Sequence, residues 1–539
     1  MELHISAPWI TNKVRCQNGY VYIDTAFWDK DKQQAGHKRE YIGKYDGTTF
    51  TPNKNYKRFD AEYMRDQAVS KPGPVPASEC IRQFYGATYL LDQISDTTGI
   101  AADLSRSFGS LSVEILSLAY FLILEEGLPL YRFKKWNVTH KHPHGTDITS
   151  QRSSEIFGMI TEEGKMDYFK RQAKRHGLKE YLAFDTTSIS SFSQLIKQAK
   201  YGKNKEGDVL PQLNLTLLYG EASMMPVYYR KLPGNISDVR TIENLLKDID
   251  FLERDKLKFV MDRGFYSERN INDMMKHHHK FLISARTSLK IVNKRLDAIR
   301  NDFVTLSHYN SELRLYVQSF MEEWDYTEEK PRSGEVFTDK RRVYIHYYYN
   351  DQKATDDKAR FNHLLDTLEA NLKDGHRDPA DEKLYGKYFD IHETPIRGIT
   401  YSFKEDAIRK VEKNYGYFVL MSNGIKDPVR ALQIYRSKDL IEKSFGNLKE
   451  RLSMRRMAVA SEENFEGKLF VQFIALSLMS YIKKYMDDNG LFKNYTMQSL
   501  LDELDVIEYY QQPGKAHHLS EITGKQKKLY EYMHVKVPV

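Results

Sequence analysis

Cysteine is scarce in this chain, since Cys16 and Cys80 are the only two among 539 residues. They offer neither a disulfide framework nor the spacing of a zinc site, and such scarcity predicts a protein of the reducing cytoplasm. Apolar runs of about 18 residues are missing too, and the first residues, MELHISAPWITNKVR, lack the apolar core of a signal peptide. We therefore expect a soluble, intracellular protein. No glycine-rich phosphate loop occurs, so ATP dependence is not expected.

Excess charge of one sign is also small. The chain has 81 basic and 74 acidic residues, which gives a net charge of +7. A basic patch would bind nucleic acid, but this total alone does not establish one. The length predicts about two to four domains. The 37 tyrosines indicate strand and core packing more than base stacking.

The first third of the chain changes pattern twice. Residues 1–70 contain short alternating runs such as GYVYIDTAFW and REYIGKY, which predict a small β-meander. Three prolines and a glycine in SKPGPVPAS (70–78) predict a linker. Residues 80–180 have helical periodicity, and the last helix is rich in lysine and arginine. A DNA-binding helix-turn-helix and an ordinary helical layer both fit this pattern.

Strand and helix patterns alternate over residues 181–287. Apolar runs predict five strands and two helices, one of them over 238–250 with Asp238 as its N-cap. This order predicts an α/β fold, a mixed sheet with helices on its faces. In such sheets, sites form beyond the carboxyl ends of the strands.

Residues 288–425 interrupt this alternation with strand-like runs (LRLYVQSF, RVYIHYYY, GYFVLMSN) and one highly charged helical segment. We interpret them as an inserted β-rich subdomain outside the main sheet. Helical patterns return over 426–485, which we assign to the same core as 181–287. Residues 486–539 are expected to form a C-terminal helical region.

Three acidic residues lie in distinctive settings. Asp185 and Asp262 each end an apolar strand-like run, in YLAFDTTS and KFVMDRGFYS, and Glu442 lies within a strong helical pattern. Carboxylates are the hard oxygen ligands that Mg²⁺ prefers, and two such ions about 3.5–4 Å apart can clamp a phosphodiester. We predict that the three carboxyl groups converge on one metal-sized site.

The helix that carries Glu442 allows a geometric check. At about 100° per residue, Tyr435, Lys438, Glu442 and Lys449 project within roughly a 60° arc. Such a face suits a metal ligand flanked by phosphate contacts. It equally suits a solvated face with ordinary charge pairs.

The spacing of Tyr435, Lys438, Glu442 and Lys449 resembles the YREK signature of insertion-sequence DDE transposases, which are bacterial and archaeal cut-and-paste enzymes. That family usually has arginine at the position of Lys438, and Arg436 would share this role here. The surroundings of both aspartates, and PGNISDVRTIENLL (233–246) between them, are also similar to the family. The resemblance covers roughly residues 180–485.

The resemblance implies a ribonuclease-H-like mixed sheet flanked by helices, with a β-rich insertion and an α-helical N-terminal region that is the candidate DNA-end-binding part. It implies that Asp185, Asp262 and Glu442 are catalytic ligands of two Mg²⁺ ions, which Mn²⁺ can replace, with Asp185 bridging them. The implied DNA contacts are Tyr435, Arg436, Lys438, Lys449 and Arg263. For Arg263, a surface salt bridge fits the sequence equally well.

By this resemblance the chain cleaves DNA and transfers strands at the terminal inverted repeats of a transposon, as a homodimer in the synaptic complex with target DNA. A domesticated, non-catalytic DNA-binding protein and a metal-dependent nuclease on the same fold are the alternatives. The intact acidic triad favours catalysis, because a protein that only binds DNA does not need three carboxylates that repel phosphate.

Three further features have simpler interpretations. HHHK (277–280) is expected to cap a helix end rather than to bind metal. The aromatic residues of HYYYN (346–350) are expected to pack within a strand rather than to stack on bases. Trp324 lies in the insertion, where related hairpin-forming enzymes use a tryptophan to hold a flipped base; its acidic neighbours give that role little support.

Overall fold

The structure is a computed structural model. It describes residues 14–29, 32–47, 50–54, 76, 79–126, 128–176, 179–191, 193, 195–202, 210–236, 242, 245, 256–329, 334–394, 398–452 and 461–539. The predicted linker (70–78) and the predicted helix at 238–250 lie almost entirely outside the described residues.

The N-terminal segment forms the predicted meander. Its four antiparallel strands lie in sequence order: β1 (Val14–Gln17), β2 (Tyr20–Asp29), β3 (Gln34–Tyr45) and β4 (Phe50–Pro52). Asn18 and Gly19 join the first two strands with φ values of 51° and 74°, the left-handed backbone of a type I′ hairpin. Val21, Ile23 and Ile42 form a small core of their own.

A helical unit follows, as predicted. It contains β5 (Ile81–Phe84), α2 (Gly86–Thr97), α3 (Ile100–Phe108), α4 (Leu111–Leu124), η2 (Leu130–Arg132), α5 (Phe133–Thr139), α6 (Ser150–Met159) and α7 (Glu162–His176). Helix α4 is apolar on nearly every side because it is buried on nearly every side.

The C-terminal region packs with this unit. It was expected to be helical, but it also contains two short strands. It contains η8 (Leu491–Lys493), α17 (Met497–Asp505), β17 (Glu508–Gln511), β18 (His518–Leu519) and α18 (Gly524–Tyr532). Strand β17 pairs with β5 near the other end of the chain. The sequence pattern missed these strands because each is only two to four residues long.

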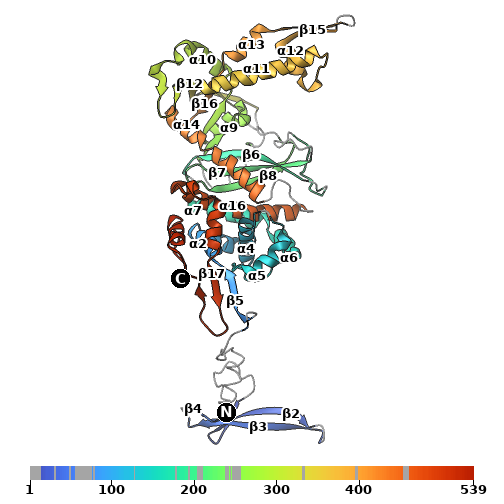
Figure 1. Cartoon of the computed structure of the whole chain (residues 1–539), viewed down its shortest axis with the longest axis vertical. Helices are drawn as coiled ribbons and strands as arrows, with labels where there is room; N and C mark the ends of the chain where they lie inside the picture. The colour runs from blue at the N-terminus through green and yellow to red at the C-terminus, as the bar shows by residue number, and fades with distance from the viewer. Residues whose placement is uncertain are drawn as a thin grey trace.

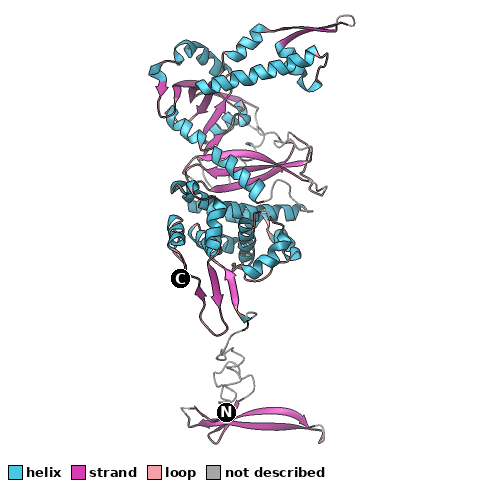
Figure 2. Ribbon diagram, viewed as in Figure 1, coloured by secondary structure: helices cyan, strands magenta, loops and turns pink. Residues whose placement is uncertain are grey.

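A nine-stranded mixed sheet forms the centre of the protein (Figure 2). Its order is β11-β12-β13-β16-β10-β9-β6-β7-β8. The strands are β6 (Leu182–Ser190), β7 (Gln212–Gly220), β8 (Pro226–Pro233), β9 (Lys258–Met261), β10 (Lys280–Ala285), β11 (Tyr309–Asn310), β12 (Leu315–Glu329), β13 (Val336–Tyr349) and β16 (Tyr417–Ser422). Strands β6, β9 and β10 run parallel to one another, and the other pairs are antiparallel. The mixed sheet confirms the predicted fold class and is consistent with a ribonuclease-H-like fold.

Helices flank this sheet. They are η4 (Arg263–Phe265), α9 (Glu268–Lys276), α10 (Lys290–Phe303), α14 (Pro428–Arg436), α15 (Asp439–Gly446) and α16 (Glu462–Asp488), with η5 (Leu306–His308) and the π-helical turn η7 (Asn447–Arg451). Helix α16 contacts β8 on one side and α4 and α6 on the other, so it lies between the sheet and the helical unit (Figure 1). Among the described helices it is the one long and apolar enough to span a membrane, but 89% of its apolar window is buried inside the protein. We therefore assign it as a core helix.

The prediction that residues 288–425 lie outside the main sheet is wrong. Strand β16 pairs with both β10 and β13, and β12 follows, so these strands extend the central sheet. Their alternating sequence predicted strands correctly, but it carried no information about their hydrogen-bonding partners. The separate part is smaller and mostly helical: α11 (Asp351–Lys373), η6 (Pro379–Asp381), α12 (Glu382–Tyr388), β14 (Phe389–Thr394), β15 (Gly398–Phe403) and α13 (Glu405–Glu412). It has its own apolar core, and we call residues 351–412 the helical insertion.

Candidate active site

Asp185 and Asp262 lie side by side on neighbouring strands. In the parallel pair of β6 and β9, Phe184 is opposite Met261, so the two aspartates occupy the next level of the same register. Side chains at one level of a parallel pair point to the same face of the sheet. Asp262 directly follows the end of β9, as predicted. Asp185, in contrast, lies inside β6, which continues to Ser190 along β7.

Buried neighbours fix these two aspartates. Leu182, Ala183 and Phe184 precede Asp185 and are almost fully buried. After Asp262 the chain turns into η4, which places Phe265 against Phe184 with 4.9 Å between ring centroids. The Thr186 backbone N–H donates to Asp185 Oδ1 at 2.8 Å. The apolar sequence on both strands therefore holds two carboxylates at one place on the sheet.

Tyr435, near the end of α14, contacts the second aspartate. Its hydroxyl donates to Asp262 Oδ1 at 3.0 Å. Burial raises the pKa of Tyr435 well above its usual value, and the negative charge of Asp262 raises it further. The phenol therefore remains a protonated donor that orients Asp262. Ser284 on β10 also bonds to Tyr435, and the β9–β10 register places Ser284 at the level of Asp262.

Lys438 joins the third acidic residue to the first. Its Nζ lies 3.2 Å from Glu442 Oε1 and 3.7 Å from Asp185 Oδ2, and only 8% of its side chain is exposed. Burial by itself would lower the pKa of Lys438, but the charges of Asp185, Asp262 and Glu442 outweigh it and raise the pKa. The three carboxylates therefore act together on one buried ammonium group.

The predicted metal-sized cluster of three carboxylates is not formed. Among the described residues, no three His, Cys, Asp or Glu side chains are grouped closely enough to hold a metal ion. Glu442 is the outlying member, because 61% of its side chain is exposed and it forms an ion pair with Lys438. The donor set still fits a hard divalent cation, since its ligands are carboxylate oxygens and two of the carboxylates already pair with a positive charge. The exposed Glu442 side chain has room to change rotamer.

The predicted continuous helical face is wrong. Helix α14 ends at Arg436, α15 begins at Asp439, and η7 continues as a π-helical turn. Rotation at 100° per residue therefore does not hold from Tyr435 to Lys449. Tyr435 and Lys438 contact the carboxylates directly, whereas the sequence predicted contacts with DNA phosphates.

The other predicted DNA contacts lie around this centre. Arg436 is exposed at the end of α14, and Lys449 is partly buried in η7. Arg263 is exposed in η4, directly after Asp262. Together with Lys353 and Arg360 of the helical insertion, it lines a pocket of about 460 Å³.

Sequence reasoning missed Ser284. It stands near the end of the run KFLISA, where it looks like an ordinary strand residue. Only the strand register brings it to the level of Asp262, so no local signal marked it.

The histidine run, the aromatic strand and Trp324 all have structural roles. His277 caps α9, and its Nδ1 lies 2.8 Å from the Asp273 carbonyl oxygen, as predicted. Tyr347 and Tyr348 are buried in β13, which confirms strand packing. Trp324 is 6% exposed, and its Nε1 donates to Asn272 Oδ1 at 2.7 Å, so it packs inside the protein.

The family model described as "Transposase DDE domain" matches residues 176–478, a span that contains Asp185, Asp262 and Glu442. Among solved structures, the chain is similar to the piggyBac transposase in its cryo-EM synaptic complex with hairpin DNA. The identity is 8%, the match covers 81% of this chain and 82% of that chain, and the TM-score is 0.35. A search of curated protein sequences found no match.

Proposed function

The chain belongs to the family of transposases with a DDE domain, and from this premise we propose that it cleaves and joins DNA at transposon ends by cut-and-paste transposition. The observation that carries the proposal is the arrangement of Asp185 and Asp262 in one register, with Lys438 linking Asp185 to Glu442. A structural role alone does not account for two aspartates at one level of the sheet beside a buried lysine, because burying charge costs free energy.

We assign Asp185, Asp262 and Glu442 as the catalytic residues that would hold two Mg²⁺ ions, for which Mn²⁺ could substitute. When bound, these ions would activate water and then a 3′-hydroxyl for in-line attack on phosphorus. Tyr435 holds Asp262 through its hydrogen bond. Lys438 neutralises the carboxylates through its two ion pairs.

Three cations are proposed to hold the DNA backbone near this centre. Arg263 follows a catalytic aspartate directly, Arg436 is exposed at the end of α14, and Lys449 lies one helical segment beyond Glu442. Arginine and lysine position the backbone through phosphate contacts that are independent of sequence.

The partners follow from the same proposal. The chain would bind the terminal inverted repeats of an insertion sequence and a target DNA, and act as a homodimer because two transposon ends must be brought together. A cytoplasmic location fits its two free cysteines, Cys16 and Cys80.

The test separates catalysis from binding. Asp262→Asn is nearly isosteric and removes one anionic ligand, so metal-dependent nicking of end-containing DNA should fall to background. DNA binding in a gel-shift assay should hold or tighten slightly, because one repulsive charge is gone. Lys449→Ala is the matched variant, and it should weaken binding and reduce its salt dependence while the metal chemistry remains.

Three outcomes would replace the proposal. Nicking by Asp262→Asn at the wild-type rate would remove the metal assignment, and no nicking by the wild type with binding intact would indicate a domesticated binding protein. Nicking without any strand-transfer product would leave a metal-dependent nuclease.

A further inference from the structure

A basic pocket lies at the strand ends of the central sheet that face away from the candidate active site. It has a volume of about 550 Å³. Lys256 precedes β9, Lys280 begins β10, and Lys426 follows β16, which runs antiparallel to β10. Arg342 reaches the pocket from β13. Because β9 and β10 are parallel, their amino-terminal ends meet here, whereas Asp262 follows the carboxyl end of β9.

The exposed cations of this pocket are not held in ion pairs with any residue that the structure describes. Among the described residues that line it, none is aspartate or glutamate. Lys256, Lys280, Arg342 and Lys426 are all exposed, and within the described part of the chain their side chains form no ion pair or hydrogen bond. Arg341 also lines the pocket, but it is engaged with the Met275 carbonyl at 3.0 Å and the Tyr326 ring at 3.4 Å. Four cations are therefore available to a ligand.

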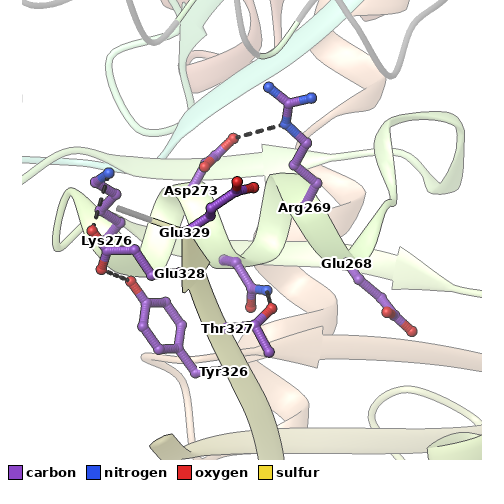
Figure 3. A pocket seen from close by; sticks show the side chains of 9 residues that line it. Glu268, Arg269, Asp273, Lys276, Tyr326, Thr327, Glu328 and Glu329 are labelled. Carbon is purple, nitrogen blue, oxygen red and sulfur yellow. Dashed lines mark hydrogen bonds and ion pairs between the residues drawn. The ribbon is translucent and has the colours of Figure 1, made fainter. Parts of the chain in front are cut away.

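A neighbouring pocket of about 610 Å³ provides a contrast (Figure 3). It also contains cations, but Lys276 pairs with Glu328 at 3.1 Å and Arg269 with Asp273 at 3.9 Å. Tyr326 donates to the same Glu328 at 2.6 Å. Cations that are paired with carboxylates attract an anionic ligand only weakly. Of these two pockets, the one lined by Lys256, Lys280, Arg342 and Lys426 is therefore, within the described part of the chain, the one with unpaired positive charge.

We propose that this basic pocket binds the phosphate backbone of duplex DNA at a place separate from the active site. Four cations, on or just beyond the ends of strands in one sheet, provide fixed positive charge for phosphates, which are read without regard to base sequence. Lys256 precedes Asp262 by six residues along a nearly extended chain, so the pocket lies on the order of 20 Å from the catalytic carboxylates at about 3.3 Å per residue. A phosphate held here is therefore not the one that is cleaved. The identification of the polyanion as DNA rests on the proposed function.

The first experiment measures the salt dependence of binding to a random-sequence DNA duplex. The triple variant Lys280→Ala, Arg342→Ala, Lys426→Ala removes three candidate phosphate contacts. Each contact contributes about 0.9 to the slope of log K against log salt, so the slope should decrease in magnitude by up to about 2.7. The control is Lys493→Ala, Lys527→Ala, Lys528→Ala, which removes three exposed cations of the C-terminal region. Its slope should remain at the wild-type value.

The second experiment uses the unmodified protein, so it does not depend on the folding of a variant. Acetylation of lysines is followed by mass spectrometry with and without saturating duplex. Lys256, Lys280 and Lys426 should be protected several-fold, and Lys493 and Lys527 of the C-terminal region should not. An unchanged slope in the first variant, or equal labelling of the pocket lysines with and without DNA, would overturn the proposal. Protection by single-stranded RNA but not by duplex DNA would overturn it as well.

A nicking assay on end-containing DNA at saturating protein distinguishes failure of the proposed function from failure of the basic-pocket proposal. The triple variant should still nick, because none of its residues belongs to the catalytic centre. Protection of the pocket by DNA in a wild-type protein that does not nick would contradict the proposed function alone. Nicking with no protection and no slope change would contradict this inference alone.

Discussion

At the scale of single residues, Lys438 is the group that connects the candidate site. Its ammonium is buried against Asp185 and Glu442, and its pKa is raised in spite of that burial. A buried cation of this kind reports a strong negative potential at its position. It occupies the region to which a divalent cation would be attracted, so lysine and metal should compete.

Replacing Lys438 with methionine tests this competition. The variant should lose about 1–3 kcal/mol of stability without metal, because carboxylates are left without their partner. It should also gain more from added Mg²⁺ or Mn²⁺, since the metal binds the folded state without displacing an ammonium. Thermal unfolding with and without metal measures both effects.

Lys438→Arg is the matched control, because it keeps the charge and should keep a small metal-induced shift. Equal metal-induced shifts in the methionine variant and the wild type would mean that Lys438 and the metal do not share a site.

At the scale of elements, the contact of α6 with α16 decides how the helical unit meets the sheet. Gly467 in α16 packs directly on the backbone of α6. A Cβ placed on it would lie 2.1 Å from the Phe157 carbonyl oxygen and 2.4 Å from Phe157 Cα. Backbone atoms cannot move aside as a flexible side chain can, so this position accepts only glycine.

Gly467→Ala should therefore destabilise the protein by about 1–3 kcal/mol through overpacking. This is opposite in sign to the usual effect, since alanine is favoured over glycine in a helix by up to about 1 kcal/mol. Gly158→Ala in α6 is the control, because its Cβ would meet only Asn464 Oδ1 at 3.8 Å. Thermal unfolding of both variants measures the difference, and a stabilised Gly467→Ala would show that the two helices do not pack this closely.

At the scale of the whole molecule, the helical insertion is joined to the sheet at a single place. Tyr349 at the end of β13 is opposite Tyr417 at the start of β16, and their rings are 4.9 Å apart. The insertion leaves and returns between these two paired residues, and it has its own apolar core. The sheet therefore does not need the insertion in order to form.

Replacing residues 350–416 with Asn-Gly should give a folded protein. A two-residue turn of this type matches the twist of an antiparallel pair and would close β13 and β16 as a hairpin. We expect one cooperative thermal transition and resistance to limited proteolysis. We expect cleavage of DNA to be abolished, because the deletion removes Lys353 and Arg360, which line the pocket that contains Arg263.

Deletion of residues 315–349 is the contrasting variant. It removes β12 and β13 from the sheet and exposes β16, so it should aggregate or unfold. Similar behaviour of both deletions would contradict the boundary drawn here between sheet and insertion.

The sequence by itself determined the local features of this protein. Alternating apolar runs predicted the strands that carry Asp185 and Asp262, turn residues predicted the N-terminal meander, and helical periodicity predicted residues 80–180. Each of these depends on propensities and patterns within a few residues, which the chain carries locally. The three acidic residues were also recognisable, because their neighbours and spacing resemble those of a family.

Only the tertiary structure decided which elements meet. It placed β12, β13 and β16 in the central sheet, brought Ser284 level with Asp262, and set Lys438 beside Asp185. Strand partners, register and helix breaks are selected by the burial of whole faces and by contacts distant in sequence. No local pattern encodes that selection, so Tyr435 and Lys438, which were predicted as phosphate contacts, contact Asp262, Asp185 and Glu442 instead.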